Sequence, residues 1–331
     1  MRRTGVALGR GNRHGSLLVT GGRAERCSQT AGHVYCRKRQ TTSLTGMWKT
    51  DYPMILYKYL QRARLDVLKA KKIRFTQPGD FNDPFEFRPR IQSVASEEHV
   101  RAYVEDNFEQ LVEQQLDKYG ALIKAPPQPA LKELLYQQKA RIPELFRLLE
   151  PPMIAKVSSL LDGALNQNVG VLCLSEVRDS ILMWGHYAEN HRGFVVGFDS
   201  KHPFFSLRRT EQDEFGILRQ VDYQRKRPIV TLSDTSSPAW FQTKSEQWAY
   251  EKEWRIVRVL SDANCQLQCT PFPICLFDFP ADAVLELIVG MRSAPSFVAD
   301  MRSIAIGFPK AVVLQAHEDP SDYALVIEEL S

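Results

Sequence analysis

The stretch WAYEKEWRIVRV, Trp248 to Val259, constrains the fold most, because it joins acidic and aromatic residues directly to an apolar strand. From Trp254 onward the apolar residues alternate as in a half-buried strand. Side chains at i and i+2 of a strand share a face, so Glu251 and Glu253 are predicted to lie side by side where the strand begins. Two carboxylates that close repel each other and raise the pKa of one of them. Such a pair can form a reactive paired-carboxylate site. The alternative is a solvated face on which the acids are neutralised by neighbouring basic residues, Lys252, Arg255 and Arg258.

The positive charge of the chain comes from its first 46 residues. The formal net charge is +4, but residues 1–46 carry nine basic residues and one acidic residue, so the remainder carries about −4. A net charge of about −4 on the rest of the chain gives no general reason to expect nucleic acid binding, although a local basic groove is compatible with that charge. Residues 1–46 are rich in Arg, Gly, Ser and Thr, which predicts a disordered basic leader. It resembles either a transit peptide or upstream sequence translated ahead of a start at Met47, and we favour the second.

Neither a membrane nor a metal is expected from the composition. The chain has no apolar run of about 18 residues, so no membrane span is predicted. The spacing Cys265-x3-Cys269-x5-Cys275 lacks a second cluster and a nearby histidine, which argues against a structural zinc site. Cys173 lies inside the apolar run VGVLCLS and is interpreted as a small buried hydrophobic residue. We therefore expect reduced thiols and a cytoplasmic location.

Residues 47–331 are predicted to form a single α+β domain with a helical insertion at about 96–168. Strands are predicted at 54–60, 73–76, 169–175, 194–198, 221–223, 283–289, 311–316 and 323–327. Short helices are predicted at 65–72, 181–191 and 295–304. In the insertion, helices are predicted from residue 96, over 131–149 and over 154–165, with a break at Pro151 and Pro152. The charges of the insertion are interpreted as solvated helix faces.

The loop FNDPFE, Phe81 to Glu86, and the helix ILMWGHYAENH, Ile181 to His191, carry polar groups suited to binding. In the loop these are Asn82, Asp83 and Glu86, although the loop is equally explained by an Asx turn. In the helix, Trp184 and Tyr187 share one face while His186 lies on another. The alternatives are core packing for the two aromatic residues and a buried, hydrogen-bonded histidine. His186 and His191 are five apart and cannot form the i,i+4 pair of a helical zinc site.

Four basic residues are the best local candidates for contact with phosphate: Arg225, Lys226, Arg227 and Lys244. Most runs of this kind are solvated turns, which is the alternative.

The common ATP-binding loops, the dinucleotide fingerprint G-x-G-x-x-G and the hydrolase motif G-x-S-x-G are absent from the sequence.

Six motifs, in this order, resemble the bacterial family called domain of unknown function 2971. They are LYKYL (Leu56–Leu60), FNDPFE (Phe81–Glu86), CLSE (Cys173–Glu176), MWGHYAENHRGF (Met183–Phe194), VDYQRKRP (Val221–Pro228) and KSEQWAYEKEWRIV (Lys244–Val257). The resemblance runs from Met47 to the C-terminus and implies that the domain begins near Met47. The family implies no activity.

Three of these segments also resemble the marks of ADP-ribosyltransferases, which lie on a split mixed sheet. Tyr57 or Lys58 stands at the first mark, on an early strand. Ser175 stands at the second, where a strand leads into a short helix and a further strand. Glu253 stands at the third, with Glu251 as the first acid of E-x-E. The chain departs from the pattern, because the first mark has no His or Arg and Ser175 lacks the flanking Thr and Ser. The implied fold is α+β, ADP-ribosyltransferase-like, with a split mixed sheet and a helical insertion.

The same resemblance implies NAD as a substrate. Glu253 would stabilise the oxocarbenium-like state as the nicotinamide–ribose bond breaks. Glu251 would orient an acceptor, and His186 would be a general acid or base. The implied NAD-binding residues are Tyr57, Lys58, Asn82, Asp83, Ser175, Trp184, Tyr187, Lys244 and Arg255.

Two other functions are left open by the sequence. One is a module that binds a nucleotide or a peptide without chemistry. The other is a phosphodiesterase or nuclease whose divalent metal is held by carboxylates, namely Asp83, Glu86, Glu251 and Glu253. The partner is expected to be a nucleotide or another small molecule, and the sequence does not identify a protein or nucleic-acid acceptor.

Overall fold

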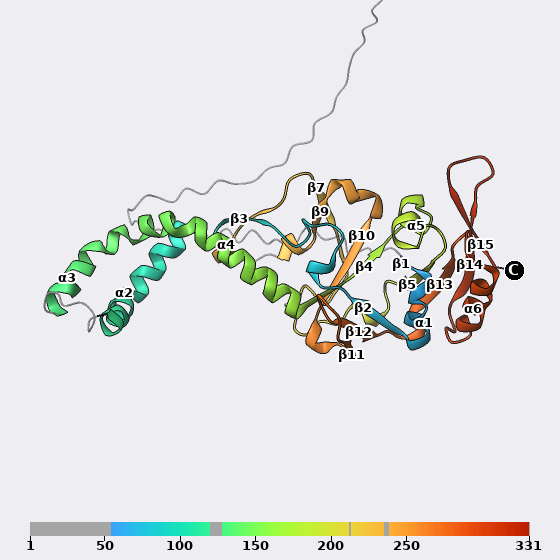
Figure 1. The fold of residues 1–331 in the computed structure, drawn as a ribbon, viewed down its shortest axis with the longest axis horizontal. Coiled ribbons are helices and arrows are strands. Elements are labelled where there is room, and N and C mark those ends of the chain that lie inside the picture. Colours follow the sequence, from blue (N-terminus) through green and yellow to red (C-terminus); the bar gives the residue numbers. More distant parts are fainter. Residues whose placement is uncertain (1–53, 120–127, 212, 235–237, 331) are drawn as a thin grey trace, which may run out of the picture. The chain divides into compact units, whose positions relative to one another are not determined.

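An eight-stranded mixed sheet organises the fold, with β4 (Val169–Ser175) inside it, as its continuous apolar run predicts (Figure 1). The strand order is β15-β14-β13-β5-β1-β4-β10-β6, and only β13 and β14 are parallel neighbours. The other strands of this sheet are β1 (Ile55–Leu60), β5 (Phe194–Asp199), β6 (Arg219–Gln220), β10 (Glu253–Val259), β13 (Val284–Val289), β14 (Val312–Glu318) and β15 (Leu325–Glu329).

The computed structural model describes residues 54–119, 128–211, 213–234 and 238–330, all within one unit, Thr50–Ser331. The predicted leader, residues 1–46, lies outside the described residues. A smaller sheet has the order β11-β12-β2, and two parallel pairs are formed by β3 with β8 and by β7 with β9. These strands are β2 (Lys72–Phe75), β3 (Arg90–Ser93), β7 (Asp222–Gln224), β8 (Ile229–Thr231), β9 (Thr243–Ser245), β11 (Cys265–Leu267) and β12 (Ile274–Asp278).

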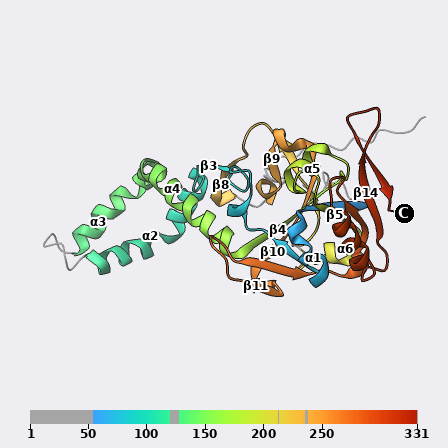
Figure 2. The same cartoon turned by 45° about the vertical axis from the view of Figure 1, so that its right-hand side comes forward.

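The two faces of the large sheet are covered by different helices (Figure 2). Helices α1 (Asp66–Ala70) and α6 (Pro295–Ala305) contribute to the larger core, together with Phe75 and Phe277 of the small sheet. On the other face, α5 (Ile181–Tyr187) contributes Met183 and Trp184 to a second core. Ser180 caps α5 by accepting a hydrogen bond from the Met183 N–H. Helix α5 ends four residues earlier than predicted, because Glu189, Asn190 and His191 adopt positive φ angles.

The sheet opens between β1 and β4. β1 pairs with β5 along all six of its residues, but it pairs with β4 only at Tyr57, which lies opposite Ser175. Lys58 reaches across this boundary, and its ammonium donates a hydrogen bond to the Cys173 carbonyl at 3.0 Å. The predicted mixed sheet is confirmed, and the opening between β1 and β4 places side chains there in place of backbone hydrogen bonds.

The predicted insertion forms three helices that pack together, α2 (Glu97–Tyr119), α3 (Gln128–Gln138) and α4 (Ile142–Asn168). Val104, Phe108 and Val112 of α2 form a small core against Phe146 of α4 and residues of α3. The predicted break at Pro151 and Pro152 is wrong, because α4 continues through both prolines. Each proline removes a backbone donor, but Phe146 packs on α2 before the prolines, and Asn166 accepts a hydrogen bond from the Gly79 N–H after them. Tertiary packing on both sides therefore overrides the local cost.

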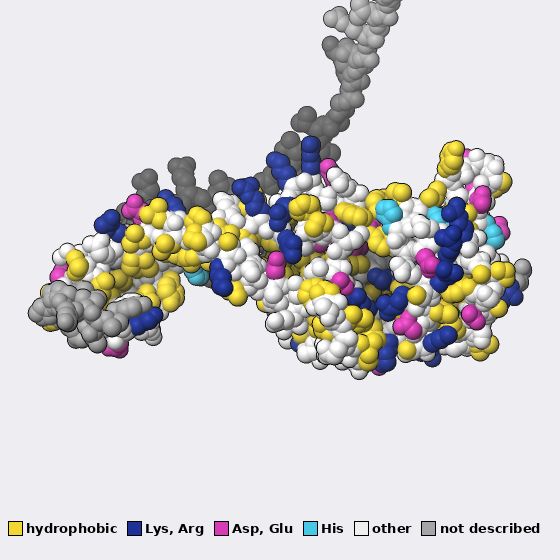
Figure 3. All heavy atoms as spheres, in the orientation of Figure 1, with side chains coloured by type: hydrophobic (Ala, Val, Ile, Leu, Met, Phe, Trp, Pro, Cys, Tyr) yellow, Lys and Arg dark blue, Asp and Glu magenta, His cyan; other side chains and the backbone are white. Residues whose placement is uncertain are grey.

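Hydrophobic side chains remain exposed along these helices (Figure 3). The exposed residues include Leu134, Leu145, Leu148, Leu149 and Leu160. Among the described residues, no helix has the length and hydrophobicity that a membrane crossing requires.

Candidate functional site

A cavity of about 260 Å³ lies at the opening between β1 and β4, and we call it the first cavity. Its walls come from β1, β4, α5 and the loop that contains FNDPFE. Tyr57 and Ser175 line it from one face of the sheet, while Lys58 and Leu174 lie at alternate positions on the same strands. The cavity therefore enters the sheet where the strands part, instead of lying on one of its faces.

The three residues that stand at the ADP-ribosyltransferase-like marks lie in one row across the sheet. Tyr57 on β1 is opposite Ser175 on β4, and Ser175 is opposite Glu253 on β10. Residues paired directly across strands project from the same face, so all three side chains share one face. All three also line the first cavity.

The floor of the cavity is a buried ionic cluster centred on Lys244 of β9. Its ammonium lies 2.9 Å from Glu86 Oε1, 2.6 Å from Glu251 Oε2 and 2.9 Å from Glu253 Oε2. An ammonium has three N–H donors, so each of them meets a different carboxylate. Arg255 of β10 is the second cation of the cluster. The five members of the cluster, Glu86, Lys244, Glu251, Glu253 and Arg255, are each at most 6% exposed.

Arg255 fixes two of the carboxylates in position. Its Nε donates to Glu253 Oε1 at 2.7 Å, and its Nη2 donates to Glu253 Oε2 at 3.0 Å and to Glu86 Oε1 at 2.6 Å. Its guanidinium also lies 5.2 Å from the centre of the Phe87 ring, which belongs to the loop beyond Glu86. The bidentate contact holds Glu253 of the same strand, and the single bond to Glu86 together with the Phe87 contact joins the loop to β10.

The cluster has three carboxylates and two cations, so it carries a net charge of −1 when every group is ionised. Burial alone would raise the pKa of Glu253, but Arg255 and Lys244 outweigh burial and hold that pKa below its usual range. For Glu86, burial together with the neighbouring Glu253 raises the pKa despite the two cations. The three carboxylates outweigh burial at Lys244 and raise its pKa. A raised carboxyl pKa is thus found at Glu86, whereas the pKa of Glu253, a member of the pair for which it was predicted, is lowered.

Tyr187 connects the cluster to the loop. Its hydroxyl donates to Glu251 Oε1 at 2.6 Å and accepts from Asn82 Nδ2 at 2.9 Å. Burial, followed by the hydrogen bond to Glu251, raises the pKa of Tyr187. Ser175 Oγ donates to the Glu251 carbonyl at 2.6 Å. Tyr187 and Ser175 thus bind Glu251 directly, Asn82 binds Tyr187, and all three line the cavity.

The predicted arrangement of Glu251 and Glu253 on one strand face is wrong. Glu251 ends a 3₁₀ helix, η7 (Glu246–Glu251), and Lys252 turns the chain with φ of 42° before β10 begins at Glu253. The two carboxylates come together because both bind Lys244. The solvated-face alternative is also wrong, because the acids are buried and are neutralised by Lys244 and Arg255. Lys252 is exposed, and Arg258 donates to the Phe204 carbonyl among phenylalanine rings.

Four of the predicted site residues lie away from the lining of the first cavity. His186 is exposed, and its Nδ1 lies 3.2 Å from the Tyr250 hydroxyl. Trp184 is fully buried, packs edge-on against Tyr59 and donates to the Arg178 carbonyl. Asp83 lines a neighbouring cavity, and Arg255 lies beneath the carboxylates. The core-packing alternative therefore describes Trp184, whereas the buried-histidine alternative does not describe His186.

Several lining residues were not predicted from the sequence. They include Tyr59, Thr76, Asp80, Met183 and Cys173. Cys173 was interpreted as a buried hydrophobic residue, but it is only partly buried and pairs across strands with Arg255. Burial, followed by the Glu253 charge, raises the pKa of its thiol. Nothing in the apolar run VGVLCLS indicates that Cys173 lines the first cavity.

Three of the four carboxylates proposed for a divalent metal, Glu86, Glu251 and Glu253, are engaged by cations of the protein. The Lys244 ammonium lies between Glu86, Glu251 and Glu253, where a shared metal ion would have to bind. Within the part of the chain that the structure describes, no group of three or more His, Cys, Asp and Glu side chains is suited to hold a metal ion.

The cluster predicts how stability changes with pH. Unfolded Glu253 takes up a proton near pH 4.5, whereas folded Glu253 does so only at lower pH. Below 4.5 the unfolded state therefore binds more protons, and the free energy of unfolding falls by up to about 1.4 kcal/mol per pH unit from this group. Glu86 has a raised pKa in the folded state, so above pH 4.5 its contribution makes the free energy of unfolding fall as the pH rises. Urea unfolding between pH 3 and 7 measures both effects. The acid-side slope should be shallower in Glu253→Gln, and equal slopes would contradict the assignment.

Comparison with known sequences finds a similarity over part of the chain. Residues 183–256 match the sequence model of the family described as "Protein of unknown function (DUF2971)". This segment includes the last five residues of α5, all of β5, Lys244 and the start of β10, so it contains four of the five residues of the ionic cluster. No curated protein and no solved structure matches the chain, and the ADP-ribosyltransferase resemblance receives no support from these comparisons.

Proposed function

We propose that the first cavity binds NAD and cleaves its nicotinamide–ribose bond, in the manner of an ADP-ribosyltransferase. One observation carries the proposal: Tyr57, Ser175 and Glu253 stand in a single row across the opening of the sheet and all line the cavity. In the sequence Tyr57 lies more than a hundred residues from the other two, yet the fold brings the three side chains into one row.

The charge of the site favours the cationic ring of NAD. The buried cluster beneath the cavity has a net charge of −1, and Tyr57, Tyr187 and Phe81 contribute aromatic rings to the walls. Aromatic faces and carboxylates both attract a positively charged ring. Tyr187 is the better ring to stack on nicotinamide, because it is half-buried whereas Tyr57 is only 7% exposed and belongs to the core.

Glu253 is suited to stabilise positive charge on the ribose. Its carboxylate accepts three hydrogen bonds from Lys244 and Arg255, and the weak S–H donor of Cys173 faces it as well. A carboxylate has about four acceptor positions, so a ribose hydroxyl would replace the thiol, which is the weakest donor. Its low pKa keeps Glu253 ionised at neutral pH. Because Arg255 and Lys244 fix the carboxylate, little reorganisation is needed as charge develops.

The bond changes are those of glycosyl transfer. The bond between ribose C1′ and the ring nitrogen breaks, and its electron pair returns to the nitrogen, so neutral nicotinamide leaves. The oxocarbenium-like ribose faces Glu253 until a nucleophile adds at C1′ and releases its proton. Glu251, held by Tyr187 and Lys244, would orient that nucleophile. Lys58 would contact the pyrophosphate, since its ammonium uses one donor on the Cys173 carbonyl and it lines the first cavity, which Arg255 does not.

The test is release of nicotinamide from NAD by the full-length chain, measured in EDTA. We expect slow release, together with a rise in melting temperature when NAD is added. EDTA removes the divalent ions that a phosphodiesterase or nuclease would need. A rise in melting temperature without release would indicate a non-catalytic nucleotide-binding module. Absence of both effects would overturn the proposal.

Tyr187→Phe is expected to weaken NAD binding by about 3- to 10-fold, because it removes one neutral hydroxyl that holds Glu251 and Asn82. The dissociation constant from isothermal titration measures this change. Tyr250→Phe is the matched control, since the Tyr250 hydroxyl contacts His186 outside the cavity. Equal losses in the two variants would contradict a role for Tyr187 in the site.

A further inference from the structure

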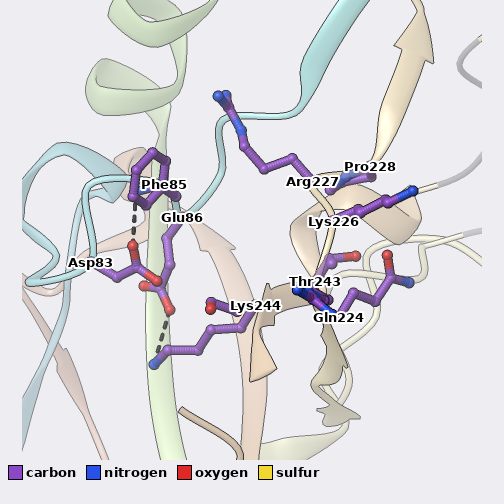
Figure 4. A pocket seen from close by; sticks show the side chains of 11 residues that line it. Asp83, Phe85, Glu86, Gln224, Lys226, Arg227, Pro228, Thr243 and Lys244 are labelled. Atoms are coloured by element: carbon purple, nitrogen blue, oxygen red, sulfur yellow. Dashed lines mark hydrogen bonds and ion pairs between the residues drawn. The ribbon is translucent and has the colours of Figure 1, made fainter. Parts of the chain in front are cut away.

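A second cavity of about 240 Å³ lies on the other side of the Glu86–Lys244 ion pair (Figure 4). It shares only these two residues with the first cavity. Its walls come from the FNDPFE loop, from the segment Gln224–Pro228 and from β9. The proposed cleavage of NAD assigns no role to this space, although it adjoins the same buried cluster.

Asp83 provides an unused acceptor in the second cavity. The residue is 4% exposed, and its Oδ1 accepts a hydrogen bond from the Phe85 N–H at 2.9 Å, which is the Asx turn expected from the sequence. Its Oδ2 is buried and has no hydrogen-bond partner among the described residues. Figure 4 shows its carboxyl group beside that of Glu86 on the same wall. Buried carboxylate oxygens are nearly always hydrogen-bonded, so this oxygen is suited to an N–H or O–H donor of a ligand.

The opposite wall is basic and faces an aromatic ring. Arg225, Lys226 and Arg227 line the cavity in succession, and all three are exposed. Arg227 is held in place, because its Nε donates to the Arg88 carbonyl at 2.9 Å and its guanidinium lies 5.7 Å from the centre of the Phe85 ring. Phe85 is 60% exposed. A cationic rim attracts phosphate, and an exposed aromatic ring offers a surface on which a base can stack.

We propose that the second cavity binds a phosphorylated nucleoside. Its phosphate contacts Arg225 and Lys226, its base stacks on Phe85, and an N–H or O–H of the base or sugar donates to Asp83 Oδ2. Phosphate alone would use the basic rim but leave Asp83 unpaired, and an uncharged nucleoside would leave the rim unused. The combination therefore selects a molecule with all three features. The proposal holds whether or not the first cavity cleaves NAD.

The experiment is isothermal titration of the full-length chain at low salt with AMP, GMP, CMP and UMP, beside ribose 5-phosphate and inorganic phosphate. We expect at least one mononucleotide to bind more tightly than either phosphate probe. Asp83→Asn should weaken that binding by about tenfold or more, because the new amide keeps the acceptor for the Phe85 N–H but presents a donor in place of Oδ2. Arg225→Ala/Lys226→Ala should weaken it by a similar factor and reduce its salt dependence.

Two control variants establish whether the mononucleotide binds in the second cavity. Lys69→Ala/Lys201→Ala removes two exposed positive charges elsewhere and should leave mononucleotide binding unchanged. Tyr187→Phe removes a hydroxyl of a residue that lines the first cavity and not the second, so mononucleotide binding should stay close to that of the parent, and a failure of the NAD proposal does not affect this result. A short single strand with a 5′-phosphate distinguishes a strand end from a free nucleotide as the source of the ligand. No binding by any mononucleotide or strand, equal binding of inorganic phosphate, or unchanged binding in both site variants would overturn the proposal.

Discussion

Arg255→Met is expected to lower the free energy of unfolding by about 3–5 kcal/mol, the range measured when one partner of a buried ion pair is removed. The substitution keeps an apolar chain of similar length but leaves Glu86, Glu251 and Glu253 with Lys244 as the one cation of the cluster. The net charge of the cluster then changes from −1 to −2 in a place where every member is at most 6% exposed. Urea unfolding at pH 7 measures the loss.

The origin of this loss can be tested by restoring the charge. Glu253→Gln/Arg255→Met returns the cluster to a net charge of −1, so it should be more stable than Arg255→Met alone. Lowering the pH should also stabilise Arg255→Met, because protons neutralise the uncompensated carboxylates in its folded state. Both results are expected if the loss of stability comes from uncompensated charge, and neither is expected if it comes from lost packing. A double variant that is less stable than Arg255→Met would contradict an electrostatic origin of the loss.

Arg258→Met is the matched control on the same strand. Arg258 is also an arginine of β10, but it donates to the Phe204 carbonyl and lies 4.5 Å from the centre of the Phe204 ring. Burial lowers its pKa to about 10. Its guanidinium is therefore charged at neutral pH, and loss of its hydrogen bond is expected to cost about 1.5–3 kcal/mol, less than the loss from Arg255→Met. Glu253→Gln should give no recovery in this background.

Local patterns predicted the parts of the fold that depend on neighbours in sequence. The run VGVLCLS predicted β4 to the residue, and the periodicity of residues 96–168 predicted a helical insertion. The break predicted at Pro151 and Pro152 was wrong, because the tertiary contacts that keep α4 helical there come from residues distant in the sequence. The strands missed, such as β9 and β11, have only three residues each and depend on distant partners.

The sequence predicted most residues of the candidate site but not how those residues are arranged. Glu251 and Glu253 were identified, but the positive φ of Lys252 that separates them has no sequence signal, since lysine has no preference for that conformation. Lys244 was interpreted as a phosphate ligand. Its position among three carboxylates follows from the pairing of β7 with β9, in which Tyr223 lies opposite Lys244. Arg255 binds Glu86, which lies 169 residues away in the sequence, and no spacing pattern predicts a contact over that separation.

Glu253→Gln is expected to reduce nicotinamide release from NAD by about 10²- to 10³-fold, the loss typical when one preorganised electrostatic group is removed from an active site. NAD affinity should change much less, because the ground-state ribose carries little of the charge that Glu253 stabilises. The fold should persist, since the amide is isosteric and the net charge of the cluster changes from −1 to 0. Release rates and dissociation constants, measured on the same preparation, separate the two effects.

Glu251→Gln provides the comparison that assigns the role of Glu253. It removes the same charge from the same cluster, and the Glu251 carboxylate also accepts a hydrogen bond from Lys244 at 2.6 Å. If general electrostatics governed the reaction, the two variants would lose activity equally. If Glu253 faces the ribose and Glu251 orients the nucleophile, Glu253→Gln should show the larger loss of nicotinamide release, while Glu251→Gln should mainly lower transfer to an added nucleophile. The row formed by Tyr57, Ser175 and Glu253 favours the second outcome, because Glu251 lies outside that row.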